Sequence, residues 1–392
     1  MKYWRGYLVA GLLAALTVGL MTFAAAHTAL VDMIYPYMTR LIQNTLADWT
    51  SGLSVCLWQL GAVLLIAALL SSIVLMVILR WNFVQWLGWV LAGVSLLFTL
   101  HTGMYSLNSY AGPLCEDIRL EKTRYTTTEL AEATKFFGDI AGTLATQVPR
   151  DNTGAPDYPA FSELAQLAGN GFDNLVTEKY MSVFAGSTAP VKELGWADLY
   201  TSMGIVGVTM GLTGEAAVNP QTPVVAMPFV MCHEMAHRMC ITLERDANLA
   251  GFLACDVNES PIFRYSGYLM AYRYCFNALW NVGTSSAQAA AADIARNLHP
   301  LVQQDLDNYD AFFDAHRNEA ATDLATSAND AYIKVSGDES GTKSYDEVYD
   351  LLVSWYIQEI YLPAHKEEEQ SFDPLDKNQV DLSQAPVAGG HP

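Results

Sequence analysis

Three long stretches of this 392-residue chain contain no charged residue. Asp, Glu, Lys and Arg are all missing from Gly6–Val31, Thr50–Leu79 and Trp81–Cys115. Each stretch can supply the ~20 apolar residues that a helix needs to cross the hydrocarbon core of a bilayer. The sequence therefore predicts a membrane domain, residues 1–102, with three transmembrane helices, and it excludes a chain that is soluble throughout.

Basic residues are scarce in this membrane domain, and their positions predict its orientation. The positive-inside rule places Lys2, Arg5 and Arg80 in the cytoplasm and leaves Arg40 outside. The N-terminus is then cytoplasmic, and everything after residue 103 is extracellular, in a multi-pass protein of the cell membrane. A cleavable signal peptide is the alternative for the first stretch, because residues 24–26 are alanines suited to cleavage. Both alternatives leave the rest of the chain outside.

The rest of the chain is poor in positive charge and shows no phosphate-binding loop. It carries 17 basic against 39 acidic residues, a net charge of −22. This surplus disfavours nucleic acid and anionic lipid headgroups as partners of that part of the chain. Its glycines at 204, 207, 211 and 214 do not have the spacing of a phosphate loop. We therefore expect no nucleic-acid partner.

Cysteine is also sparse, and the spacing of the six residues is not that of a disulfide-rich framework. Four of them fall in predicted helices or at helix ends, where free cysteine packs as a small apolar residue: Cys232, Cys240, Cys255 and Cys275. One disulfide remains possible. A cysteine-ligated zinc is not expected, because Cys232 points about 100° away from the neighbouring His233 on a helix.

Hydrophobic periodicity predicts a mainly helical exterior domain, residues 103–365, with a small β-sheet. The expected helices span residues 128–147, 160–180, 228–240, 243–256, 261–281 and 285–297, with more to about 361. Two short strands, 205–210 and 215–218, are expected to flank a glycine-containing turn. The tail, residues 366–392, is acidic and then rich in Pro and Gly, which predicts disorder.

A further helix is expected between the first two spans. Apolar residues recur there at helical spacing: Ile34, Met38, Leu41, Ile42, Leu46 and Trp49. Such an amphipathic helix lies either on the outer membrane face or against the exterior domain. The sequence leaves both placements open.

The most informative motif is the sequence His233-Glu234-Met235-Ala236-His237, which follows a proline that can open a helix, Pro228. Residues four apart lie one above the other on a helix, so His233 and His237 can hold one Zn²⁺. Glu234 is then placed to take a proton from a water that the metal activates. The motif predicts catalytic zinc chemistry.

A catalytic zinc site needs a third protein ligand, and the next helix offers one. Glu244 lies seven residues past His237, in the first turn of that helix, and Asp246 is the substitute. Asn248, one turn further, shares the face of Glu244. We expect Asn248 and Asp246 to support the ligands from behind.

Two levels of family resemblance rest on these residues. Glu244-x-x-Ala247-Asn248 resembles the Glu-x-x-Ala-Asp segment that supplies the third ligand in membrane-bound gluzincins. Nearly the whole chain resembles domain of unknown function 3810, a family of bacterial membrane proteins. The similar stretches are Leu212–Asn219, Met227–His237, Glu244–Cys255, Phe263–Tyr274, Asn329–Tyr332 and Lys343–Tyr345. The resemblance implies a zincin-like, gluzincin-type exterior domain. Cys240 is a departure, because a glycine often stands there in the family.

Substrate-binding and transition-state residues are predicted from zincin chemistry. Zincins bind substrate as an added strand along a sheet edge, which makes Glu215, Ala217 and Asn219 the candidate substrate-binding residues. A plain structural hairpin is the alternative. The hydroxyl of Tyr268 or Tyr265 is the candidate to steady an oxyanion. Aromatic residues at helical spacing also form core stripes, which is the alternative for both tyrosines.

The features combine into one functional prediction and one alternative. The prediction is a membrane-anchored zinc metalloendopeptidase that hydrolyses peptide bonds of a peptide or protein substrate outside the cytoplasmic membrane. Its cofactor is Zn²⁺, and the lipid bilayer is its second partner. The alternative is a non-catalytic zinc-binding envelope scaffold or signalling protein. Neither the substrate nor the oligomeric state follows from the sequence.

Overall fold

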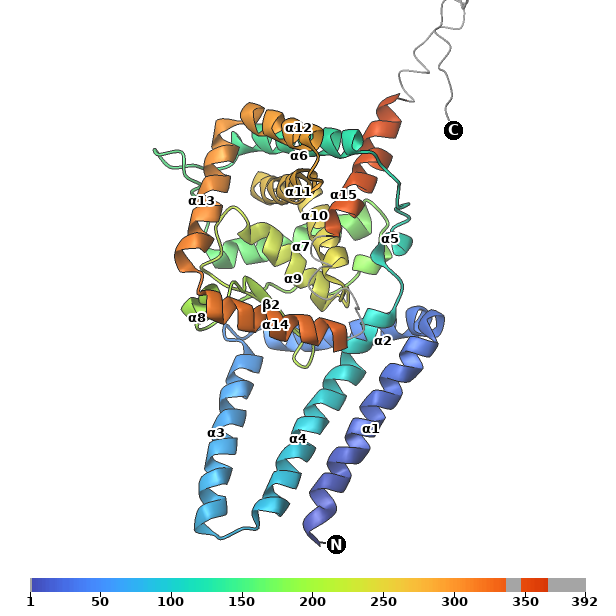
Figure 1. Ribbon diagram of the computed structural model, residues 1–392, viewed down its shortest axis with the longest axis vertical. Coiled ribbons are helices and arrows are strands. Elements are labelled where there is room, and N and C mark those ends of the chain that lie inside the picture. Colours follow the sequence, from blue (N-terminus) through green and yellow to red (C-terminus); the bar gives the residue numbers. More distant parts are fainter. Residues whose placement is uncertain (1, 336–346, 366–392) are drawn as a thin grey trace, which may run out of the picture.

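The computed structural model describes residues 2–335 and 347–365, which form a mainly helical protein with one small sheet (Figure 1). Within these residues, three helices are long and apolar enough to cross a membrane: α1 (Arg5–Ala26), α3 (Leu57–Ile78) and α4 (Phe83–Met104). They extend from one side of a larger helical domain. The predicted tail, 366–392, and the Lys343–Tyr345 stretch lie outside the described residues.

Close contact between small residues holds α1 against α4. A Cβ atom on Gly6 would lie 2.4 Å from the carbonyl carbon of Gly88, so the two backbones can approach only because both residues are glycine. Farther along, the hydroxyls of Thr17 and Thr99 share a hydrogen bond of 2.8 Å. Small residues and interhelical hydrogen bonds are the contacts that join helices within lipid. Along α3, in contrast, Gln59 is the one buried residue.

The helix expected between the first two spans is α2 (Thr28–Ser51), which lies across the ends of the apolar helices (Figure 1). One face packs on the helical domain: Arg40 Nε donates to the Met239 carbonyl at 3.3 Å, and Gln43 Nε2 donates to that of Gly211 at 2.8 Å. The opposite face leaves apolar side chains exposed, namely Ile34, Met38, Leu41 and Trp49. Packing on the domain is thus confirmed for the polar face, and most of the predicted apolar face stays uncovered.

The helical domain follows the predicted order of helices. Its helices are α5 (Leu114–Asp117), α6 (Thr127–Ala145), α7 (Phe161–Thr177), α8 (Ala197–Ser202), α9 (Met227–Arg238), α10 (Glu244–Asp256), α11 (Pro261–Asn281), α12 (Ser285–Asn297), α13 (Pro300–His316), α14 (Glu319–Val335) and α15 (Val348–Tyr356). Short 3-10 turns cover Lys2–Trp4, Ser106–Tyr110 and Ser182–Phe184, and a π-helical turn covers Ile357–Tyr361. Helix α11 lies at the centre, in contact with α6, α9, α10 and α15.

A three-stranded sheet lies between this helical core and α2. Its strands are β1 (Lys192–Glu193), β2 (Gly207–Met210) and β3 (Glu215–Val218), in the order β1-β3-β2. β3 pairs in parallel with β1 and antiparallel with β2. The hairpin of β2 and β3 confirms the predicted strands, whereas β1 is too short for its periodicity to show in the sequence. Helix α9 packs on both β2 and β3.

The cysteines behave as small apolar residues. All six are buried and free, so the disulfide that the sequence left open does not form. Burial raises the pKa of the Cys240 thiol to about 11, which makes it a poor nucleophile. The thiols therefore contribute to packing.

Candidate metal centre

Helix α9 carries the two histidines and is buried on nearly every side. Pro228 occupies the first turn, as predicted, and the Phe229 N–H donates to Ser266 Oγ of α11 at 3.0 Å. The rings of His233 and His237 face the same way one turn apart, with centroids 4.6 Å apart and planes at 85°. The proline start and the neighbouring helix α11 thus fix the rotation of α9 and the direction of both imidazoles.

A tight turn after α9 returns the chain toward the histidines. Cys240 adopts the left-handed conformation, φ +71°, and the Ile241 N–H donates to the Ala236 carbonyl at 3.2 Å. This is the hydrogen bond of a Schellman C-cap, in which glycine is the usual left-handed residue. Cysteine there costs roughly 1–2 kcal/mol in backbone strain. The departure from the family at Cys240 therefore leaves the turn intact, and α10 begins at Glu244.

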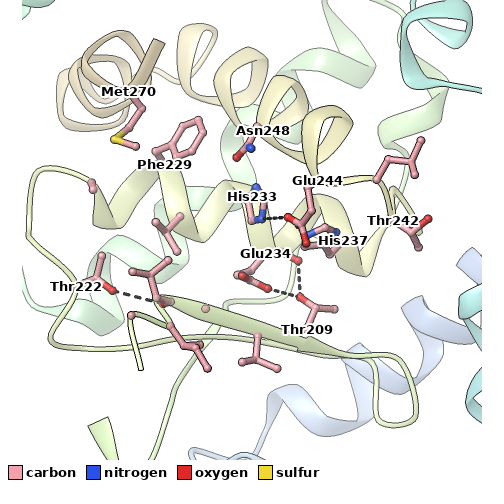
Figure 2. A pocket seen from close by; sticks show the side chains of 18 of the residues that line it. Thr209, Thr222, Phe229, His233, Glu234, His237, Thr242, Glu244, Asn248 and Met270 are labelled. Carbon is pink, nitrogen blue, oxygen red and sulfur yellow. Dashed lines mark hydrogen bonds and ion pairs between the residues drawn. The ribbon is translucent and has the colours of Figure 1, made fainter. Parts of the chain in front are cut away.

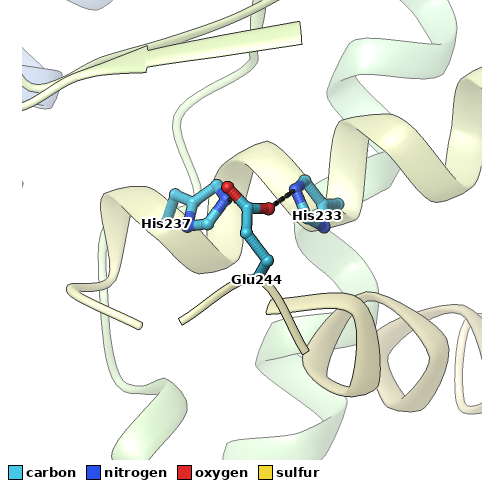
Figure 3. A group of neighbouring side chains, drawn as sticks. All are labelled: His233, His237 and Glu244. Carbon is cyan, nitrogen blue, oxygen red and sulfur yellow. Dashed lines mark ion pairs between the residues drawn. The ribbon is translucent and has the colours of Figure 1, made fainter. Parts of the chain in front are cut away.

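Glu244 meets both histidines (Figure 3). Its Oε2 atom lies 3.4 Å from Nε2 of His233 and 3.4 Å from Nε2 of His237. Two ligands at 2.0–2.1 Å from a tetrahedral zinc lie about 3.3–3.4 Å apart, so this spacing suits the ion. The Glu244 Oε2 atom is also buried without a hydrogen-bond partner among the described residues. The donor set of two imidazoles and one carboxylate fits Zn²⁺.

The charges of the cluster reinforce one another. Burial disfavours a charged imidazole, but the Glu244 carboxylate outweighs it and raises the pKa of His237 to about 9. Burial likewise disfavours a charged carboxylate, yet the two imidazoles hold the pKa of Glu244 well below its usual range. In the metal-free protein a proton on His237 therefore neutralises Glu244. A divalent cation would replace that proton.

The hydrogen bonds behind the ligands are partly those expected. His237 Nδ1 lies 2.8 Å from the Ile241 carbonyl, which fixes the proton on Nδ1 and leaves Nε2 for a metal. This backbone partner carried no signal in the sequence. Asn248 lines the cavity beside the two histidines and Glu244 (Figure 2). Its side-chain oxygen accepts a hydrogen bond from the Tyr274 hydroxyl at 3.3 Å. Its support of a ligand stays a prediction.

Asp246 does not support the ligands, which corrects the prediction. Its Oδ2 atom accepts a hydrogen bond from the Leu114 N–H at 3.0 Å, and its Oδ1 atom lies 3.6 Å from Arg245 Nε. Two residues past Glu244 on a helix is a rotation of about 200°, which turns the side chain to the opposite face. Asp246 therefore ties α10 to the start of α5.

Glu234 lies against the edge strand β2. The Thr209 hydroxyl contacts Glu234 Oε2 at 2.7 Å and the Glu234 carbonyl at 2.9 Å (Figure 2). Gly207 leaves the space that the carboxylate fills, because a Cβ there would lie 2.3 Å from Glu234 Oε1. Burial raises the pKa of Glu234, against the opposing effect of the two histidines. A raised pKa suits a group that must both accept and return a proton.

The predicted substrate-binding residues lie in or directly after β3, which is not an edge strand. β3 is the middle strand of the sheet, so its backbone is paired on both sides and no edge is left for a substrate. Ala217 is fully buried, and Asn219 donates to the Thr201 hydroxyl at 2.8 Å. Glu215 forms a buried ion pair with Lys192 at 2.6 Å. The edge that faces the metal helix belongs to β2, whose Gly207 and Thr209 the sequence did not identify as site residues.

The two predicted tyrosines are also core residues. The Tyr265 hydroxyl donates to Asp305, and the Tyr268 hydroxyl donates to Asp256 at 2.7 Å. Neither lines the cavity beside the cluster, whereas Tyr274 of the same helix does. Six residues beyond Tyr268 is a rotation of about 240°, so Tyr274 belongs to another face of α11. Periodicity could not select that face, because α11 is apolar nearly all round.

The cavity beside the metal cluster has a volume of about 560 Å³. Its walls come from β2, α9, α10 and α11, from the segment that follows α4, and from Ala325 and Thr326 of α14. His233, Glu234, His237 and Glu244 all contribute to its lining (Figure 2). No Lys or Arg is among the described residues that line it. The cluster can therefore be reached by a ligand of substantial size.

Comparison with known proteins identifies the family. Residues 31–353 match the family described as protein of unknown function (DUF3810). The match covers most of the chain, and the chain belongs to this family. Searches of curated proteins and of solved structures found no match. The predicted family resemblance is thus confirmed, and the relation to gluzincins stays a prediction.

Proposed function

We propose that this protein is a membrane-anchored zinc metalloendopeptidase that hydrolyses peptide bonds outside the cytoplasmic membrane. The supporting observation is that one Glu244 oxygen lies 3.4 Å from Nε2 of each histidine, at one wall of a 560 Å³ cavity. Glu234, which lies between the two histidines in the sequence, also lines this cavity. These are the parts that hydrolysis by an activated water requires.

The topology of the proposal follows from the three apolar helices. The N-terminus and the link between α3 and α4 lie at the same end of these helices, away from the helical domain (Figure 1). Lys2, Arg5 and Arg80 are at that end, so the positive-inside rule assigns it to the cytoplasm. α1, α3 and α4 then cross the membrane, and the helical domain lies outside the cell.

The chemistry is divided between the ligands and Glu234. His233, His237 and Glu244 would hold Zn²⁺, which when bound supplies a Lewis acid for the scissile carbonyl and for the attacking water. The Glu234 carboxylate accepts a proton from the water as its oxygen bonds to the carbonyl carbon. The same carboxyl group then gives that proton to the amine nitrogen as the C–N bond breaks. The Tyr274 hydroxyl lines the cavity and donates to Asn248, and it would have to turn from Asn248 to the substrate oxygen to serve as the oxyanion donor first assigned to Tyr268 or Tyr265.

The lining of the cavity favours an endopeptidase. An enzyme that removes C-terminal residues has to bind the substrate carboxylate, and Arg is the side chain best suited to hold one. The described lining has neither Arg nor Lys. Apolar side chains form much of the wall instead, namely Ile205, Val206, Phe229, Val230 and Met270. We therefore expect cleavage within a chain, next to apolar substrate residues.

Zinc content and peptide hydrolysis together test the proposal. Full-length protein in detergent should carry about one zinc per chain and cleave a mixed peptide library. Glu234→Gln should keep the zinc and lose the cleavage, while His233→Ala should lose both. Equal cleavage by wild type and Glu234→Gln would refute the peptidase. Zinc binding without any cleavage would instead support the non-catalytic scaffold or signalling protein.

A further inference from the structure

The metal centre is joined directly to the end of an apolar helix. Tyr105 follows α4 without a linker, and its hydroxyl donates to the His237 carbonyl at 3.0 Å. Ser109 donates to the Thr242 hydroxyl at 3.2 Å, two residues before Glu244. Tyr105 and Ser109 both line the cavity. The end of α4 is therefore a wall of the candidate active site.

The length of α4 fixes the height of that wall above the bilayer. Its 22 residues extend about 33 Å, which matches the ~30 Å hydrocarbon core. Tyr105 then lies at the outer interface, where tyrosine is commonly found. His237 is in hydrogen-bond contact with Tyr105, so the metal ligands lie within roughly one helix diameter, ~10 Å, of the membrane surface.

Helix α2 provides a second attachment at the same height. Arg40 binds the end of α9, and Gln43 binds Gly211, the residue directly after β2. On the other face, Met38, Leu41 and Trp49 are 60%, 69% and 77% exposed. Because α2 lies across the ends of the apolar helices with its polar face bound to the domain, its exposed apolar face is placed to enter the lipid surface. β2, the candidate substrate edge, therefore ends at a helix that rests on the bilayer.

The sheet provides a third attachment, through Glu215. Its carboxylate accepts hydrogen bonds from the Leu57 and Trp58 N–H groups at 2.8 and 3.0 Å, at the start of α3. A carboxylate is favourable there because the helix N-terminus carries unpaired N–H groups and a partial positive charge. The metal helix is thus bound by Tyr105 after α4 and by α2, the residue after β2 is bound by α2, and β3 is bound to the start of α3. These attachments hold the site at the bilayer surface.

From this placement we infer the substrate class: membrane-anchored polypeptides, cleaved in the extended segment directly outside the bilayer. The inference rests on the proposed peptidase function. An extended chain rises ~3.3 Å per residue, so about three residues beyond a transmembrane span or a lipid anchor cover the ~10 Å between the membrane surface and the site. A strand laid along β2 leads to α2 and so to the membrane at one end. A bond far from the anchor, on a rigid stalk, does not reach the cavity.

The test varies the distance of the cleavable peptide bonds from the membrane surface while the amount of peptide on the membrane stays the same. Full-length protein is reconstituted in phosphatidylcholine vesicles with a lipid-linked peptide library, joined through a polyproline spacer of about 4 or about 14 residues. At ~3.1 Å a residue, these rigid spacers hold the library about 12 or about 43 Å from the lipid. The same library without a lipid serves as the soluble reference, and Glu234→Gln protein is the control for each substrate.

We expect the short-spacer library to be cleaved at least ~10-fold faster than the long-spacer library, which the geometry holds beyond reach. Equal rates for both spacers, lost in Glu234→Gln, would overturn the substrate class and leave the peptidase in place. Faster cleavage of the long-spacer or soluble library would overturn it in the same way. If no library is cleaved in vesicles or in detergent, the proposed function fails, and the inference fails with it.

Discussion

Substitution of Gly207 by Ala tests whether β2 holds the Glu234 carboxylate in its working position. The added Cβ would lie 2.3 Å from Glu234 Oε1 and 2.6 Å from both Cδ and Cγ. Ordinary contact begins near 3.4 Å, so the carboxylate has to move by about 1 Å. A displacement of this size can lower a catalytic rate about 10²-fold, or ~2.7 kcal/mol in the barrier. We expect this loss in kcat/KM for peptide hydrolysis.

Zinc content separates this effect from damage to the metal centre. None of the three atoms nearest the new Cβ belongs to His233, His237 or Glu244, so zinc should remain at the wild-type level. Gly52→Ala is the matched control, because its Cβ would meet no atom within 4 Å. Loss of zinc in Gly207→Ala would show that Gly207 acts through something other than Glu234.

Three further predictions concern the metal, the sheet and the tyrosines. Because the pKa of His237 is raised from 6.5 to about 9, zinc must displace its proton below pH 9. The apparent zinc affinity should rise up to tenfold per pH unit between 6.5 and 9, and a flat profile in a chelator competition would contradict this. Glu215→Gln removes the charge that pairs with the buried Lys192, so the free energy of unfolding, measured by thermal unfolding, should fall by roughly 3 kcal/mol. Glu193 is exposed, so the control Glu193→Gln should change it little. Tyr274→Phe should lower kcat by up to ~10²-fold with KM unchanged, while Tyr268→Phe keeps kcat, and equal kcat values would exclude Tyr274 as the oxyanion donor.

Local features of the chain were predictable because they depend on neighbours in sequence. Charge-free stretches of more than 20 residues define the three apolar helices, since a span must satisfy its backbone within one segment. His233 and His237 share a helix face because of the 3.6-residue repeat alone. Glu244 follows in the first turn of the next helix. Because the turn that joins the two helices is short, it restricts Glu244 to positions near the histidines. These parts of the fold and site were determined by the sequence.

Pairings between distant segments were decided only by the tertiary structure. β1 is two residues long and carries no periodicity, yet its pairing makes β3 the middle strand and β2 the edge. Because β3 is the middle strand, Glu215 does not bind substrate and instead accepts a hydrogen bond from the start of α3. Because β2 is the edge strand, Gly207 lies against Glu234. The face of α11 that meets the cavity depends in the same way on the helices around it. Strand order and the packing of an apolar helix are set by contacts across the whole chain, which no local pattern encodes.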